Sequence, residues 1–142
     1  MSTTDRSEAP RVAGPCSAVD RFATELGARL LDVEVGRARV ELLAQERHCN
    51  DLGTVHGGVL FSLADVALAV ASNAREGEMA VAITGGIHYL RPGRPGDRLV
   101  AEAVEQHRGG RLGSYAIAIR SGEETIATAM ATTLLTGRRE QA

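Results

Sequence analysis

The run "HGGVLFSLADVALAVA", residues 56–71, constrains the fold of this chain more than any other stretch. It is the most apolar segment of its length, and after its opening His56 it holds one ionisable side chain, Asp65. Its Ala and Leu content, continued to about Arg75, predicts a helix of about five turns. Because apolar residues occur on all its sides, we expect this helix to be buried and not amphipathic.

Shorter periodic segments surround this helix. Residues 17–27 have helical spacing, with Ser17 or Asp20 as the N-cap, and residues 28–44 alternate around a turn signal at Gly36, which predicts a hairpin or one bent strand. After the helix, four strand candidates (79–90, 97–107, 112–121 and 125–136) are separated by glycine-rich turns and predict a four-stranded meander. This order favours an α+β fold in which an antiparallel sheet covers part of one helix and a second subunit covers the rest.

Length and composition narrow the classes of protein. The 142 residues suit one domain, which we place at 16–137, after a disordered leader at 1–15 and before a polar tail at 138–142. The net charge of -2 offers no basic excess for nucleic acid or an anionic membrane, and no apolar stretch reaches the roughly 18 residues of a membrane span. Cys16 and Cys49 form no CxxC pair, so we expect reduced thiols in a cytoplasmic protein.

Two glycines open the long helix. The first N–H groups of a helix lack internal partners and carry the positive end of its dipole. Gly57 and Gly58 let another group approach this backbone closely, and an oxyanion or a polarised carbonyl oxygen fits there. The alternative is that the two glycines only permit a tight entry into the helix.

Asp65 stands in the middle of the same helix. A buried ionised carboxylate is costly unless it is paired, so it needs a partner or a function. At ~100° and 1.5 Å per residue, Asp65 lies about half a turn round from His56 and ~12 Å from the N–H of Gly57. Both groups can therefore act on one substrate only if a second copy of the helix packs antiparallel across a two-fold axis. The alternative is a structural carboxylate bonded to Ser62 or to a neighbouring subunit's backbone.

These residues resemble a known family. The segment "HGGVLFSLAD", with Asn50 six residues before its histidine and "IHYLRPG" after the helix, is similar to the PaaI-like branch of the hotdog-fold acyl-CoA thioesterases. The resemblance runs from about Asn50 to the last strand, and a related branch usually carries Glu where this chain has Asp65. It implies a hotdog fold and hydrolysis of acyl-CoA without metal or cofactor. It also implies a homodimer that forms the site, within a homotetramer built as a dimer of dimers.

The resemblance also assigns roles to residues. Asp65 becomes the catalytic nucleophile or general base, and the Gly57 N–H of the other subunit becomes the oxyanion donor. His56 and Asn50 orient this segment and position the thioester or water.

The family often adds a Ser or Thr from the strand facing the helix. A simple register places Ala82 or Ile83 there, so Thr84 is the nearest hydroxyl on that strand, and Ser62 on the helix is a second candidate. The residues expected to border coenzyme A lie in two loops: Tyr89, Arg91 and Arg94, then Arg108, Gly110 and Arg111.

By analogy, the favoured substrate is an aryl-acetyl or hydroxyphenylacetyl-type CoA of phenylacetate degradation. Two alternatives stay open. A hotdog enoyl-CoA hydratase or dehydratase would need a histidine and an acid on one substrate. A non-catalytic acyl-CoA-binding protein would usually carry an extra DNA-binding segment. The pair His48–Cys49 lacks the further ligands that a zinc site needs.

Overall fold

The structure is a computed structural model that describes residues 20–138. The predicted leader at 1–15 lies outside the described residues, and so do Cys16 and Ser17. Of the predicted tail at 138–142, residues 139–142 also lie outside them. The elements in chain order are α1 (Arg21–Leu26), β1 (Arg29–Glu34), β2 (Arg37–Leu43), the 3-10 helix η1 (Glu46–His48), α2 (Gly57–Ser72), β3 (Glu78–Tyr89), β4 (Arg98–Gly109), β5 (Leu112–Ser121) and β6 (Glu124–Arg138).

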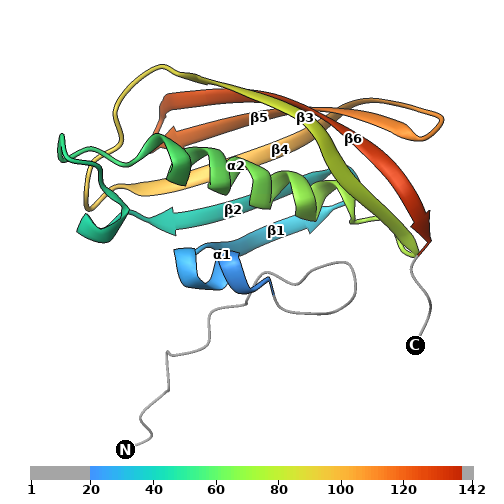
Figure 1. Cartoon of the computed structure of the whole chain (residues 1–142), viewed down its shortest axis with the longest axis horizontal. Helices are drawn as coiled ribbons and strands as arrows, with labels where there is room; N and C mark the ends of the chain where they lie inside the picture. Colours follow the sequence, from blue (N-terminus) through green and yellow to red (C-terminus); the bar gives the residue numbers. More distant parts are fainter. Residues whose placement is uncertain (1–19, 139–142) are drawn as a thin grey trace, which may run out of the picture.

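All six strands form one antiparallel sheet in the order β1-β2-β4-β5-β6-β3. Helix α2 lies across one face of this sheet (Figure 1), and Leu63 and Leu68 of the helix pack with Leu42, Leu99 and Ile119 of the strands in the core. This is the α+β hotdog architecture that the resemblance implies, and the predicted hairpin is β1–β2. Within residues 20–138, no helix is both long and apolar enough to cross a membrane.

The predicted four-stranded meander is wrong in its first strand. Of the four strands after α2, only β4, β5 and β6 follow one another in the sheet. Strand β3 pairs with β6 at the edge, and β4 pairs with β2. The connection 90–97 contains Pro92 and Pro95 and does not close a hairpin between β3 and β4. Instead it passes the start of α2, where the N–H of Val55 donates to the carbonyl of Gly93 at 2.8 Å.

Within one chain, one side of α2 is uncovered, and this is the side that the expected second subunit would cover. Gly58, Phe61, Asp65 and Ala69 follow one another at helical spacing and are all exposed in the single chain. The helix also ends earlier than the predicted Arg75. Asn73 accounts for this end, because its side chain donates to the carbonyl of Ala69 at 2.9 Å and accepts from the N–H of Ala80 at 2.9 Å, which joins the helix end to β3.

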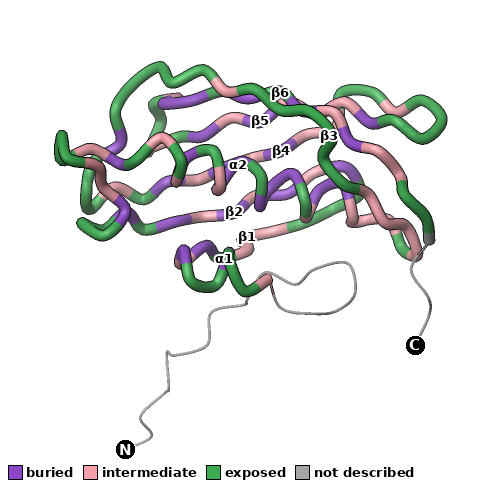
Figure 2. Tube along the Cα trace, in the orientation of Figure 1, coloured by how far each residue is buried: buried purple, intermediate pink, exposed green. Residues whose placement is uncertain are grey.

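Strand β3 is the exposed edge of the sheet, and Figure 2 shows it green along most of its length. Apolar side chains are among those left open, with Val81 46% and Ile83 49% exposed. The uncovered stripe of α2 lies beside this strand, so the two features form one continuous uncovered surface.

A polar cluster anchors the far end of α2. Arg75 donates two hydrogen bonds to the carboxylate of Glu105, at 2.8 and 3.1 Å, and the hydroxyl of the buried Tyr115 donates to it at 2.9 Å. The hydrogen bonds from Arg75 hold the pKa of Glu105 below its ordinary 4.5. Burial, followed by the bond to Glu105, raises the pKa of Tyr115 to about 12.

We expect Glu105→Gln to lower the free energy of unfolding by about 1–2 kcal/mol near neutral pH, because two charge-assisted bonds are lost. A carboxylate whose folded pKa is depressed stabilises the protein above its unfolded pKa and loses that contribution as the pH falls through the folded value. The difference between wild type and variant in urea unfolding should therefore shrink as the pH falls below 4.5. A difference that is constant across this range would contradict the assignment.

Candidate active site

His56 is the N-cap of α2. Its Nδ1 accepts the N–H of Gly58 at 2.8 Å, and its carbonyl accepts the N–H of Val59 at 2.9 Å. The N–H of Gly57 has no acceptor among residues 20–138. One donor at the positive end of the helix is therefore unused within the described part of the chain.

Asn50 organises the loop that leads into this helix. Its Oδ1 accepts from the backbone N–H groups of Leu52 and Thr54, at 3.0 and 3.2 Å, and from the Thr54 hydroxyl at 3.2 Å. The buried His48 fixes the same loop to α1, because its Nε2 lies 2.7 Å from the carbonyl oxygen of Leu26. Asn50 thus closes this loop through its side-chain oxygen, and His48 ties the loop to α1. Among the described residues no cluster of His, Cys, Asp or Glu suits a metal ion.

A first pocket opens at this end of α2. It has a volume of about 320 Å³, and Asn50, Gly57, Tyr89 and Arg91 are among the residues that line it. Tyr89 is the last residue of β3, and its hydroxyl donates to the carbonyl of Gly57 at 3.0 Å.

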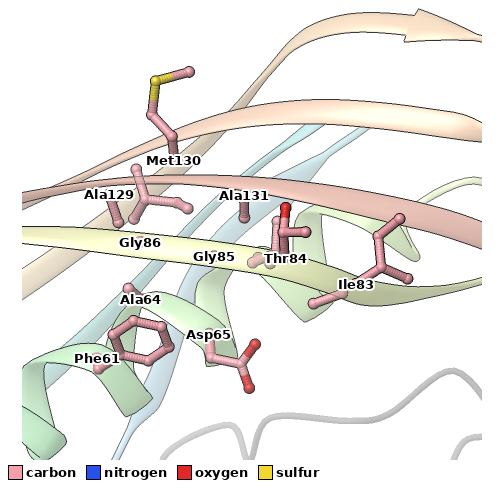
Figure 3. A pocket seen from close by; sticks show the side chains of 13 residues that line it. Phe61, Ala64, Asp65, Ile83, Thr84, Gly85, Gly86, Ala129, Met130 and Ala131 are labelled. Carbon is pink, nitrogen blue, oxygen red and sulfur yellow. The ribbon is translucent and has the colours of Figure 1, made fainter.

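A second pocket lies beside Asp65, between α2 and the strands β3 and β6 (Figure 3). Its volume is about 250 Å³ and its walls are almost entirely apolar. The lining residues are Phe61, Ala64, Asp65, Leu68, Ala82, Ile83, Thr84, Gly85, Gly86, Ile117, Ala129, Met130 and Ala131.

Asp65 makes no hydrogen bond or ion pair with any residue in 20–138. The hydroxyl of Ser62 donates instead to the carbonyl of Gly58 at 2.7 Å, so the structural pairing of Asp65 with Ser62 is not formed. Partial burial, and then the nearby charge of Asp20, raise the pKa of Asp65 above its ordinary 3.8. Asp65 is therefore a carboxylate without a structural partner, at the edge of an apolar pocket.

The strand facing α2 brings no hydroxyl to Asp65. Thr84 pairs with Thr132, on the face of the sheet away from α2, and its hydroxyl points away from Asp65 in Figure 3. Ala82 pairs with the buried Thr133, and Ile83 between them is an unpaired bulge residue. Ala82, Ile83 and Thr84 all line the pocket, and the Thr84 hydroxyl points away from Asp65.

Two residues that line this pocket, Phe61 and Gly85, were not predicted from the sequence. Phe61 is 40% exposed and lies against Gly85, where an added Cβ would stand 3.5 Å from the Phe61 Cζ atom. A glycine pair inside an apolar strand is a known signal of a bulge or a close approach, and "TGG" at 84–86 carries that signal here.

The two pockets share no residue. Asp65 belongs to one and Gly57 to the other. In a single chain Gly57 and Asp65 therefore line separate cavities, as their separation along the helix requires.

The predicted coenzyme A residues fall into two groups at opposite ends of α2 (Figure 1). Arg91 and Arg94 lie in the 90–97 connection near the helix start, where Arg91 pairs with Glu124 at 2.9 Å. The β4–β5 hairpin, with Gly110 in its turn, lies near the helix end. There Arg108 pairs with Glu78 at 2.8 Å, and the Nε of Arg111 donates to the carbonyl of Leu135 at 3.0 Å.

The chain is similar to known proteins across most of its described length. It is 41% identical over 100 residues to the acyl-coenzyme A thioesterase PaaI of Escherichia coli (strain K12), which covers 70% of this chain and 71% of that protein. The solved structure of the E. coli PaaI protein from the phenylacetic acid degradation operon superposes with a TM-score of 0.81 at 37% identity, covering 84% of this chain and 86% of that one. A hypothetical thioesterase of Streptococcus pneumoniae TIGR4, solved with coenzyme A, has a TM-score of 0.71 at 27% identity over 80% of this chain and 91% of that one.

The family model described as "Thioesterase superfamily" matches residues 52–128, which include the whole of α2, the strands β3 to β5 and the start of β6. Because this match spans more than half of the sequence, the chain belongs to the thioesterase superfamily.

Proposed function

We propose that this protein is an acyl-CoA thioesterase, which hydrolyses its substrate to a free acid and coenzyme A in a site shared by two subunits. The observation that carries the proposal is Asp65, a carboxylate without a partner among the described residues, beside an apolar pocket that suits an acyl group. The coenzyme A in the S. pneumoniae structure and the activity named for E. coli PaaI support the substrate class.

The second subunit supplies what a single chain lacks. The exposed stripe of α2 and the edge strand β3 form an uncovered apolar surface of the kind that a partner covers. If two copies of α2 pack antiparallel there, the Gly57 N–H of one subunit comes beside Asp65 of the other. Two such sites form in each dimer, and two dimers assemble into the tetramer.

The chemistry needs few groups. The thioester carbonyl oxygen accepts the Gly57 N–H, which stabilises the charge that develops on this oxygen. Asp65 either attacks the carbonyl carbon or removes a proton from the water that attacks it. The tetrahedral intermediate then collapses and expels coenzyme A as its thiolate, a good leaving group. When water attacks, this step releases the free acid; when Asp65 attacks, it leaves a mixed anhydride on Asp65, which a water then hydrolyses to the free acid and the Asp65 carboxylate. His56 Nδ1 accepts the Gly58 N–H, which supports a positioning role for His56. A hydratase would instead require a histidine that transfers a proton at carbon.

Asp65 must be ionised for either role. Its surroundings within one chain raise its pKa, which opposes ionisation. The positive end of the other subunit's α2 would act in the opposite direction and favour the carboxylate.

The same antiparallel arrangement joins the two arginine groups. The C-terminal end of one α2 comes near the N-terminal end of the other, so Arg91 and Arg94 of one subunit approach Arg108 and Arg111 of its neighbour. The ion pair of Arg91 with Glu124 is exposed (63% and 54%) and therefore weak, so a substrate phosphate can replace Glu124.

The acyl group is an aryl-acetyl or hydroxyphenylacetyl group. The pocket beside Asp65 is lined mostly by apolar residues, and among them is the ring of Phe61, which can stack on a planar acyl ring. The phenylacetic acid degradation operon that encodes the E. coli protein supports the same class.

Asp65→Asn should lower kcat for aryl-acetyl-CoA by about a thousandfold or more, because the amide neither attacks nor accepts a proton at neutral pH. Thiol release from a panel of acyl-CoAs measures the rate, and substrate binding by calorimetry should stay close to that of the wild type. Hydrolysis by the variant at the wild-type rate would refute the assignment.

Mixed dimers test the shared site. Gly57→Pro removes the N–H at the first helical position, whose backbone accepts proline, and its Cβ also presses on the Tyr89 ring, which would stand 3.1 Å away. The variant should therefore be as inactive as Asp65→Asn. After subunit exchange between the two variants, each mixed dimer holds one intact site of two, so about a quarter of wild-type activity should return. Mixing Asp65→Asn with the double variant Asp65→Asn/Gly57→Pro is the control, because no intact Asp65 is present. No recovery despite proven exchange would rule out a shared site.

Gly85→Ala tests the acyl pocket. The added methyl group stands 3.5 Å from Phe61 and 4.0 Å from Ala131, so the fold accommodates it while the pocket narrows. The ratio of kcat/KM for phenylacetyl-CoA to that for acetyl-CoA should fall by about tenfold or more. Gly86→Ala adds the same methyl group on the opposite face of the strand, where no atom lies within 4 Å, and its ratio should stay near the wild-type value. Equal ratios in the two variants would place the acyl group elsewhere.

A further inference from the structure

We propose that Tyr89 is a positioning residue for the oxyanion-binding N–H of Gly57, and not a contact for coenzyme A. The inference rests on the proposed function, because it concerns the N–H to which that function assigns the thioester oxygen. Its basis is the contact between the end of β3 and the first turn of α2.

The start of α2 is intrinsically weak. Glycine costs roughly 1 kcal/mol relative to alanine inside a helix, and here two glycines form the first turn. Helix ends fray because their terminal peptide groups lack partners within the helix. A single donor in such a turn keeps its direction only if groups from outside the helix hold the backbone.

Two side chains hold one peptide unit here. The carbonyl of Gly57 and the N–H of Gly58 belong to the same peptide. Tyr89 donates its hydroxyl to that carbonyl at 3.0 Å, and His56 Nδ1 accepts that N–H at 2.8 Å. The preceding peptide consists of the His56 carbonyl and the Gly57 N–H. It is held at its carbonyl oxygen, which accepts the N–H of Val59 at 2.9 Å. Gly57 lies between two fixed peptides, and its own N–H is the donor left unused among the described residues.

The glycines are explained by the same contacts. A Cβ on Gly57 would stand 3.1 Å from the Cζ atom of Tyr89, and a Cβ on Gly58 would stand 3.0 Å from Nδ1 of His56. Each glycine thus admits the ring that holds the peptide between them. Tyr89 and His56 therefore approach this backbone closely, in addition to the proposed substrate.

The position of Tyr89 is built into the sheet. Tyr89 pairs with Ala127 of β6, which is fully buried, so its side chain leaves β3 on the face that carries α2. The residue is 53% exposed and contributes little to the core. Loss of the hydroxyl should therefore affect the geometry of the helix start far more than the stability of the fold.

Tyr89→Phe removes the hydroxyl and keeps the ring. We expect kcat for acyl-CoA hydrolysis to fall by about five- to tenfold, with KM within about twofold of wild type and an unchanged thermal midpoint. Tyr115→Phe is the matched control, because it removes a hydroxyl bonded to Glu105 at the other end of α2. It should lower the thermal midpoint and leave kcat near the wild-type value.

A direct readout uses the Asp65→Asn background, in which bound substrate is not turned over. Infrared difference spectra of acyl-CoA labelled with carbon-13 at the thioester carbonyl should show a downshifted stretch when Tyr89 is present. This shift should be reduced in Asp65→Asn/Tyr89→Phe. A raised KM with unchanged kcat in Tyr89→Phe would overturn the proposal and return Tyr89 to coenzyme A binding. An equal carbonyl shift in Asp65→Asn and Asp65→Asn/Tyr89→Phe would also overturn it. Absence of acyl-CoA hydrolysis by the wild type would refute the proposed function itself.

Discussion

The packing of one apolar helix across a single curved sheet is the constraint on which the rest of this structure depends. Helix α2 buries Leu63, Ala67 and Leu68 against the strands, and this burial sets its rotation about its own axis. Once that rotation is set, Asp65 must lie on the uncovered stripe and the glycine turn must lie at the edge of the sheet. The positions of Asp65 and of the glycine turn, the two candidate functional features of the helix, are thus consequences of core packing.

Local patterns in the sequence were enough to predict the elements. Alternating apolar residues placed β1, β2 and the last four strands within a few residues, and the long apolar run placed α2. The fold class followed from their order, and the family resemblance sharpened it. The strand order was not accessible in the same way, because the pairing of β3 with β6 joins residues far apart in the chain and leaves no local signal.

The same distinction between local and long-range information applies to the candidate site. The positions of Asp65 and Gly57 on the helix, and their separation, follow from helix geometry alone. The bulge at Ile83, which decides where the Thr84 hydroxyl points, depends on cross-strand register. Likewise, "HYL" identifies Tyr89 as a strand residue, but only the folded sheet brings its hydroxyl to Gly57. The expected burial of Asp65 assumed cover on every side of α2, and a single chain does not supply that cover.

The separation of the two pockets has a consequence for how such a protein can diversify. The cavity proposed for the acyl group is lined by α2, the middle of β3 and β6, whereas the peptide at the helix start is held by His56 and by Tyr89, the last residue of β3. Under the proposed function, the acyl pocket and the oxyanion donor are therefore shaped by different segments, although Asp65 lies in the acyl pocket itself. Substitutions in the β3 and β6 walls can then change acyl preference while the donor at the helix start is retained.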